Sequence, residues 1–373
     1  MSNVQAGEPT EADGWQAIAD SALNLGRRGE TREALAMLQQ AIEQARQAGD
    51  RRGETIALNG AALMHSIRGD YWSALASSMD AFVMARAAQD RRCMAHALTM
   101  LAGALLLMTP IDSEIALLHA ALKIAETEED LRLQVRIHNL LGILLGDLER
   151  FGQAEVHLDL ALVLADCSKD GDTAAFDRWR LMANIANLLR KRAQSAARAG
   201  MAAEAAEHCA AGLELIGRVE IHCIEYGKVP ILLDALRISA MLLAVQGRVD
   251  LAHAKFVAAW KLAIERRQRS ALPALGVDIA RMLIDDGRLD AAEITLAEAL
   301  REAALYRPSP KAAGLCELMA EVEGGRGDRR AEAQWLKDAL IAHNEFEVLK
   351  REARRQMAGV AQSLDSIMAT QPG

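Results

Sequence analysis

Two histidine–cysteine pairs are the side chains in this sequence with the clearest potential for metal chemistry. His208–Cys209 and His222–Cys223 lie fourteen residues apart in an alanine-rich segment. On one straight helix they would be about 21 Å apart, too far to share an ion, so a turn at Gly217 would have to bring them together. Structural zinc sites space their ligands two to four residues apart, whereas these ligands are adjacent. We therefore interpret the four residues as packing residues and expect no metal and no cofactor.

The remaining chemical motifs are sparse. The stretch "DCSKDGDTAAFD" at 166–177 is acidic but lacks the ligand order and closing glutamate of a calcium loop, so a loop with a helix cap is the favoured interpretation. The sequence contains no GxGxxG, P-loop, HExxH or GxSxG motif. No catalytic residues are predicted, and we expect the chain not to be an enzyme.

Composition narrows the class of partner and the compartment. The 373 residues carry a net charge of −8 and only 3% are aromatic, which argues against a nucleic-acid-binding surface. The first residues, "MSNVQAGEPTEADGW", do not resemble a signal peptide, and no apolar run approaches about 18 residues. Five cysteines without a CxxC spacing indicate reduced packing residues. The sequence therefore predicts a cytoplasmic protein with neither nucleic acid nor membrane as partner.

A repeat organises the whole chain. The segment "GDYWSALASSMDAF" begins at Gly69, and related segments place the same turn at residues 29, 69, 109, 149, 200, 247, 287 and 327. The intervals are 40, 40, 40, 51, 47, 40 and 40 residues. Asp50, Asp90, Asp130 and Asp170 each lie twenty-one residues after one of the first four turns, where they are suited to capping the next helix. A fixed period of this length is typical of a solenoid.

Each repeat is predicted to be a helix, a turn and a second helix, because apolar residues recur at three- and four-residue steps on both sides of the turn. Small residues follow the turn at two positions seven apart, as Ala74 and Ala81 do. They share one helix face, where a larger side chain would hold neighbouring helices apart. We predict eight antiparallel helix pairs with buried alanines at the helix contacts, namely Ala34, Ala74, Ala154, Ala205, Ala252 and Ala292.

The two longer intervals locate an irregular middle. Eleven extra residues before Gly200 equal about three helical turns, and seven before Gly247 equal about two. Whole-turn insertions lengthen a helix without rotating its faces. The first insertion predicts one unusually long helix from about Thr173, and the irregular repeats span 171–246.

The pattern resembles the tetratricopeptide repeat (TPR) family, with a Gly-Asp-Tyr turn at Gly69, an alanine after it and an Ala-Leu pair further on. The resemblance covers roughly residues 15–345. The period of 40 exceeds the 34 typical of that family and is similar to a long-repeat type in bacterial regulatory proteins. It implies an all-α, right-handed α-solenoid of about eight repeats over 14–345, preceded by a disordered N-terminus at 1–13.

The resemblance also implies a binding groove. In the family the first helices line the concave face, with groove-facing residues about thirteen and ten positions before the turn. Carried over by position, these columns become polar in the middle of the chain, where a core would be apolar. Arginine beside asparagine suits a carboxylate or a peptide backbone, although solvated helix faces would show the same residues. The candidate groove residues are Arg136, Asn139, Asn187, Arg190 and Arg237.

The tail at 346–373 is a further helical segment. Its apolar residues recur almost as a heptad, at Phe346, Leu349, Ala353, Met357, Val360, Leu364 and Ile367. It resembles the segment that leads from an N-terminal repeat region into the catalytic domain of some GGDEF diguanylate cyclases, but no GGDEF motif is present. The favoured interpretation is a capping helix that closes the last repeat, and a coiled coil forming a homodimer is the alternative.

Two functions are compatible with these features. The first is a non-catalytic scaffold or adaptor that binds a segment of another protein in the groove, where arginines favour an acidic segment or a chain terminus. The second is a bacterial signalling sensor that binds a small ligand or peptide there and controls an effector.

Overall fold

The computed structural model describes residues 11–106, 112–167, 171–306 and 309–369. Regular structure in these ranges is helical throughout, with sixteen α-helices and two short 3-10 helices, η1 (Arg269–Ala271) and η2 (Ala304–Tyr306). The fold is an all-α, TPR-like helical repeat, as predicted. The first helices of the repeats are α1 (Glu11–Arg28), α3 (Arg51–Ile67), α5 (Arg91–Leu106), α7 (Leu131–Asp147), α9 (Gly171–Arg198), α11 (Val229–Val245), α13 (Leu272–Asp285) and α15 (Ala312–Arg326). The second helices are α2 (Thr31–Gln47), α4 (Tyr71–Ala87), α6 (Asp112–Thr127), α8 (Phe151–Asp166), α10 (Ala202–Glu225), α12 (Val249–Glu265), α14 (Leu289–Ala303) and α16 (Arg329–Ala369).

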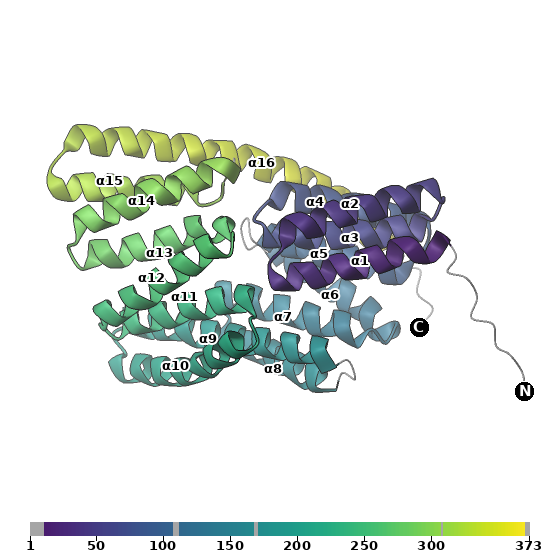
Figure 1. Cartoon of the computed structure of the whole chain (residues 1–373), viewed down its shortest axis with the longest axis horizontal. Coiled ribbons are helices and arrows are strands. Elements are labelled where there is room, and N and C mark those ends of the chain that lie inside the picture. Colours follow the sequence, from purple (N-terminus) through teal and green to yellow (C-terminus); the bar gives the residue numbers. More distant parts are fainter. Residues whose placement is uncertain (1–10, 107–111, 168–170, 307–308, 370–373) are drawn as a thin grey trace, which may run out of the picture. The chain divides into compact units, whose positions relative to one another are not determined.

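The chain forms two compact units, divided between Leu140 and Leu141 within α7. In the first unit each helix from α1 to α5 packs on its successor, and α3 also contacts α1 and α5. In the second unit the same order runs from α8 to α16, and α11 contacts both α9 and α13 (Figure 1). First helices therefore lie beside first helices, as a repeat with period 40 requires.

The turns explain the glycines of the repeat. Gly69 and Gly287 have φ values of 77° and 74°, in the left-handed region that residues with a Cβ rarely adopt. The aspartates between repeats cap the next helix: the carboxylates of Asp50, Asp90 and Asp130 accept hydrogen bonds from backbone N–H groups three residues on, at 2.9, 2.9 and 3.0 Å. Asp170 lies outside the described residues.

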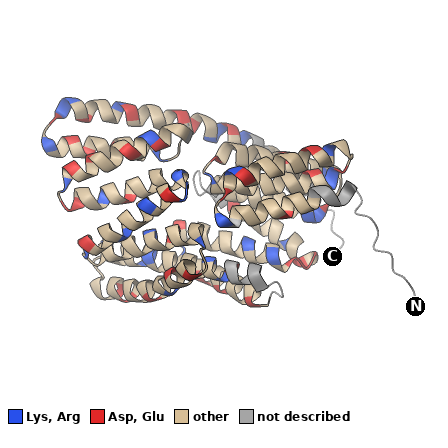
Figure 2. Cartoon of the chain, viewed as in Figure 1, with Lys and Arg blue, Asp and Glu red and all other residues tan. Residues whose placement is uncertain are grey.

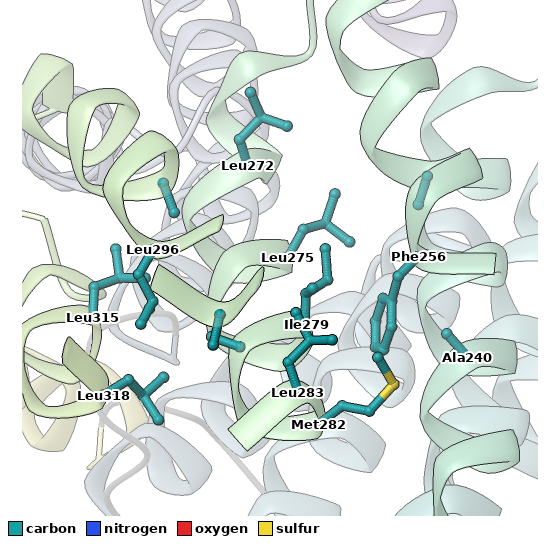
Figure 3. Close-up of a cluster of buried hydrophobic side chains, with 14 of the residues drawn as sticks. Ala240, Phe256, Leu272, Leu275, Ile279, Met282, Leu283, Leu296, Leu315 and Leu318 are labelled. Carbon is teal, nitrogen blue, oxygen red and sulfur yellow. The ribbon is translucent and has the colours of Figure 1, made fainter. Parts of the chain in front are cut away.

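The small residues lie where neighbouring helices meet. Ala34, Ala74, Ala154, Ala205, Ala252 and Ala292 are all buried, which confirms the prediction. Gly276 shows how close the helices are, because a Cβ there would lie 2.3 Å from the Cβ of Ala299 on α14. Around this contact α11 to α15 form one apolar cluster that includes Phe256, Ile279 and Leu315 (Figure 3).

The irregular middle is built from longer helices. α9 has 28 residues and α10 has 24, against 17 for α3, so they exceed the usual length by eleven and seven. These lengths match the two insertions predicted from the turn spacing, and α9 is the long helix predicted from about Thr173. α10 continues through Gly217, so the turn that a shared His–Cys metal site would need is replaced by helix. No described helix has the length and apolar character to cross a membrane.

The last helix continues past residue 345, the predicted end of the repeat domain. α16 runs from Arg329 to Ala369 without interruption, so the second helix of the last repeat and the C-terminal helix are one. Phe346, Ala353 and Val360 of the heptad are buried, whereas Leu349 and Met357 are partly exposed. The side chains of Leu364 and Ile367 lie outside the described part.

Candidate functional site

The candidate groove residues divide between the two units, and each group is described by itself. Arg136 and Asn139 belong to the first unit, on α7. Arg136 lies 3.9 Å from the sulfur of Met100 on α5 through its Nη1 atom. Asn139 is buried, with 5% of its surface exposed, so its amide lies between helices and away from open solvent.

The first helices of this unit are joined by polar contacts. Asn59 on α3 donates to the carbonyl oxygen of Cys93 on α5 at 3.4 Å. The buried carboxylate of Asp130, at the start of α7, accepts from Arg92 Nε at 2.7 Å and lies 3.4 Å from His96 Nε2. These side chains fix α3, α5 and α7 against each other, so the polar residues of this face first serve the packing of the repeat.

In the second unit the buried guanidinium of Arg190 dominates the candidate face. Only 8% of the residue is exposed. Its Nε donates to Asn187 Oδ1 at 2.8 Å and its Nη1 to Gln194 Oε1 at 2.5 Å, both on α9. Both acceptors are neutral amides, so these hydrogen bonds form without neutralising the charge. Burial, followed by repulsion from Arg237, lowers the pKa of Arg190 to about 10, while the smaller effects of Asp278 and Asp147 oppose this shift.

Arg237 carries the polar face from α9 to α11 and on to α13. Its Nε forms a close ion pair with Asp278 on α13. Two further ion pairs join first helices in the same way: Lys191 on α9 with Asp147 on α7 at 2.5 Å, and Arg281 on α13 with Glu321 on α15 at 2.7 Å. Ion pairs thus join α7 to α9, α11 to α13 and α13 to α15, and we call this series of pairs the ladder.

Two charged side chains near this ladder are accessible to water. Asp234 on α11 and Lys311, just before α15, are exposed. Yet desolvation raises the pKa of Asp234, opposed by Arg237, and lowers the pKa of Lys311, with Arg237 as a second cause. Exposure to water and desolvation occur together because water touches one side of each of these side chains while protein atoms surround the rest. We call a charge in such a position recessed. Recessed charges gain more from an opposite charge than fully solvated ones.

The repeat columns select some of the residues of this charged face and leave out others. The structure brings Asn187, Arg190 and Arg237 into one charged face, with Arg190 buried where solvent exposure was expected. Asp147, Asp278 and Lys311 were missed, because they lie outside the two columns that the resemblance marks. A signal for Asp278 was present in the sequence, because this charged residue directly follows Val277, which lies ten positions before the turn at Gly287 in one of the marked columns.

The described residues hold no group of three or more histidine, cysteine or acidic side chains placed to bind a metal ion. Cys209 and Cys223 are buried. His222 stacks between Trp179 and Tyr226, with ring centroids 4.1 and 4.4 Å apart. The His–Cys residues of α10 thus point to packing roles.

No protein-family model matches the sequence, and a search of curated proteins finds no match. Solved structures do match the fold. A Rap protein in complex with competence and sporulation factor has a TM-score of 0.60 at 12% identity, over 80% of this chain and 77% of that one. A signal transduction ATPase with numerous domains and a tetratricopeptide repeat sensor, from Pyrococcus horikoshii, has a TM-score of 0.50 at 14% identity. That match covers 91% of this chain but only 49% of the other, so this chain spans about half its length.

These likenesses, at low identity, concern the fold. They define the class as a TPR-like helical repeat protein. The particular subtype, with its suggested kinship to the repeat region of diguanylate cyclases, remains a proposal.

Proposed function

We propose that the chain is a non-catalytic interaction scaffold that binds a segment of another protein. One contact would be the charged face of the second unit, formed by Asn187, Arg190 and Arg237. The observation that carries the proposal is Arg190, a buried cation whose two hydrogen-bond acceptors on α9 are neutral amides. Buried charges in proteins are normally paired, because desolvation is costly. An acidic side chain or a chain terminus from a partner would supply a compensating negative charge.

The surrounding charges favour the same kind of ligand. Lys311 is exposed and lies within electrostatic range of Arg237. Arg237 is held by Asp278, so its orientation is set before a ligand arrives. Arg136 and Asn139 in the first unit are proposed as further contacts, because they occupy the same two repeat columns, thirteen and ten positions before a turn.

A second candidate is the peptide-responsive sensor. It is favoured by one comparison in particular, because the Rap protein is in complex with competence and sporulation factor and shares the fold over most of both chains. The two functions differ in the consequence of binding: a scaffold holds its partner, whereas a sensor changes its action on an effector.

The test is capture of partners from a lysate of the source organism, with subsequent titration of the captured segment. Arg190→Met keeps the length of the side chain, removes the charge and should leave stability unchanged or raised, since a buried charge is lost. Affinity for the segment should fall by about tenfold or more, because a charge-assisted contact is lost. Arg198→Met, which removes an exposed arginine from the same helix, is the matched control and should bind normally.

Equal binding by wild type, Arg190→Met and Arg198→Met would show that the contact lies elsewhere. Loss of folding in Arg190→Met would show that the guanidinium serves the packing of α9. Failure of the wild type to capture any specific partner would contradict the scaffold itself.

A further inference from the structure

Asp234 is an acidic residue next to the charged face of the second unit. It lies on α11, three residues before Arg237, in the column thirteen positions before the turn at Gly247. The other seven repeats have neutral or basic residues in this column, such as Asn187 on α9 and Ala274 on α13. A carboxylate at this position is therefore particular to one repeat, and the fold of the repeat does not require it.

The preceding repeat shows how the same two columns are satisfied inside the protein. Arg190 Nε on α9 donates to Asn187 Oδ1 at 2.8 Å, so the residue of the earlier column accepts from the arginine of the later one. On α11 the equivalent arginine turns to another helix, because Arg237 Nε pairs with Asp278 on α13. Within the described part of the chain the Asp234 carboxylate makes no hydrogen bond and no ion pair.

This carboxylate is accessible to a ligand. Asp234 is one of the two recessed charges near the ladder, so water reaches its side chain while protein atoms surround the rest. An ionised carboxylate can accept several hydrogen bonds, and an ammonium or guanidinium group supplies charged donors. A recessed carboxylate without a partner gains more from such a cation than a fully solvated one would.

The position of Asp234 relative to Arg190 limits the size of the ligand. α9 and α11 pack against each other, and Arg190 and Arg237 occupy the same column on them. Packed helix axes are about 8–10 Å apart, and three residues along α11 add about 4.5 Å, so the backbones at Asp234 and Arg190 are about 10 Å apart. A single amino acid, with both charges next to one carbon atom, is too short to contact both residues.

An extended peptide has the required length. It advances about 3.3 Å per residue, so opposite charges about three residues apart match the two positions. The interspersed acidic and basic residues on the helices (Figure 2) allow both signs of charge to occur side by side on one face, although the chain as a whole is acidic.

We infer that the charged face recognises a peptide segment carrying both an acidic and a cationic group, and that Asp234 binds the cationic group. The cation is a lysine or arginine side chain or a free amino terminus, about three residues from the acidic group. The inference rests on the proposed function, because the acidic group is the one assigned there to Arg190. It narrows the partner from an acidic segment to one with both charges.

Selection from a library of synthetic octapeptides on the immobilised full-length protein tests the assignment. Half of the library has free amino termini, half is acetylated, and retained peptides are identified by mass spectrometry. The wild type should enrich peptides with both an acidic and a cationic group about tenfold over the input, because each charge-assisted contact favours its matching group. Enrichment of lysine or arginine identifies a side chain as the cation, and enrichment confined to free amino termini identifies the terminus.

Variants separate the two contacts. Asp234→Asn should lose the selection for a cationic group and keep the selection for an acidic one, whereas Arg190→Met should do the reverse. Asp159→Asn, at an exposed position on α8 of the same unit, is the matched control and should select as the wild type does. Asp234→Asn should not lower the melting temperature, because it removes a recessed charge that has no ion pair.

A titration of one retained peptide checks the contact from the ligand side. The peptide is resynthesised with its cation neutralised, by norleucine for lysine, citrulline for arginine or acetylation of the amino terminus. Neutralisation should weaken binding to the wild type about tenfold and leave binding to Asp234→Asn unchanged. If Asp234→Asn does not fold, Asp234→Ser replaces it in both measurements.

The outcomes distinguish this inference from the proposed function. Retention of acidic peptides without enrichment of a cation, or an enrichment that persists in Asp234→Asn, would overturn the role of Asp234 and leave the scaffold standing. If the wild type retains no peptides at all, the assignment of the charged face as a peptide-binding contact fails together with the inference.

Discussion

Asp130 and Arg92 join two successive repeats, with Arg92 Nε of α5 donating to Asp130 Oδ2 at 2.7 Å where α7 begins. The same carboxylate also caps α7 and lies near His96. One buried side chain thus connects helix initiation with repeat packing.

Replacing this carboxylate should destabilise the first unit. Burial alone would raise the pKa of Asp130, but His96, the Leu133 N–H and Arg92 outweigh it and hold the pKa well below its usual range. Asp130→Asn should cost about 1–3 kcal/mol at neutral pH. Because the folded pKa is lowered, the stabilisation is present above about pH 4 and lost as the pH falls towards the folded value. Urea titrations at several pH values should show the variant and wild type converging in acid, whereas Asp20→Asn, at an exposed position, should match the wild type throughout.

The turn glycines should resist substitution for a conformational reason. Gly287 has φ 74°, and a Cβ there would meet nothing within 4 Å, so Gly287→Ala should cost about 1–2 kcal/mol through backbone strain alone. Gly217 lies inside α10 with similar open space, and Gly217→Ala should stabilise by about 0.5–1 kcal/mol. Thermal denaturation of the two variants should therefore shift in opposite directions; equal shifts would contradict the left-handed turn.

A second kind of glycine should fail for lack of space. At Gly276 the added methyl group would overlap Ala299, a residue with no flexible side chain to move aside. Gly276→Ala should destabilise by about 1–3 kcal/mol despite the better helix propensity of alanine. Gly314→Ala on α15, where nothing lies within 4 Å, is the matched control and should be neutral or stabilising. Similar denaturation midpoints for the two variants would show that α13 and α14 are not in close contact.

The cysteines should differ sharply in reactivity. Cys167 is exposed, and the other four are buried. Desolvation, assisted by Asp90, raises the pKa of Cys93 to about 12, and desolvation raises the pKa of Cys223 to about 11. Because the thiolate is the reactive form, one thiol per chain should react quickly with Ellman's reagent under native conditions and all five in urea. Cys167→Ser should abolish the fast reaction, and a second fast thiol would contradict the burial of the others.

The repeat made the fold predictable from sequence. Turn positions, alanines such as Ala74 and capping aspartates such as Asp50 are local sequence features. Because the period is fixed, each of these features recurs along the chain, and its recurrence makes the helical repeat recognisable. The lengths of α9 and α10 could be predicted from the spacing of Gly200 and Gly247, because added residues can only lengthen helices when the faces must stay in register.

The candidate face was less predictable. Column positions identified Arg190 but not its burial, which depends on how closely α9 packs against its neighbours. Asp278 could not be paired with Arg237 from sequence, since the two are forty-one residues apart and the pairing depends on the stagger between α11 and α13.

The order of contacts within the second unit has a mechanical meaning. Each helix from α12 to α16 contacts only helices that lie one or two places away along the chain, so contacts in this part of the unit are local and follow one another in series. α9 and α10 are different, because these lengthened helices share the most extensive contact of the unit and both also pack on α11. Opening should therefore begin among the serial links and stop at this group, whose amide hydrogens should exchange more slowly than those of α12 to α15. The two lengthened helices would act as an anchor against which the later repeats can loosen and close again.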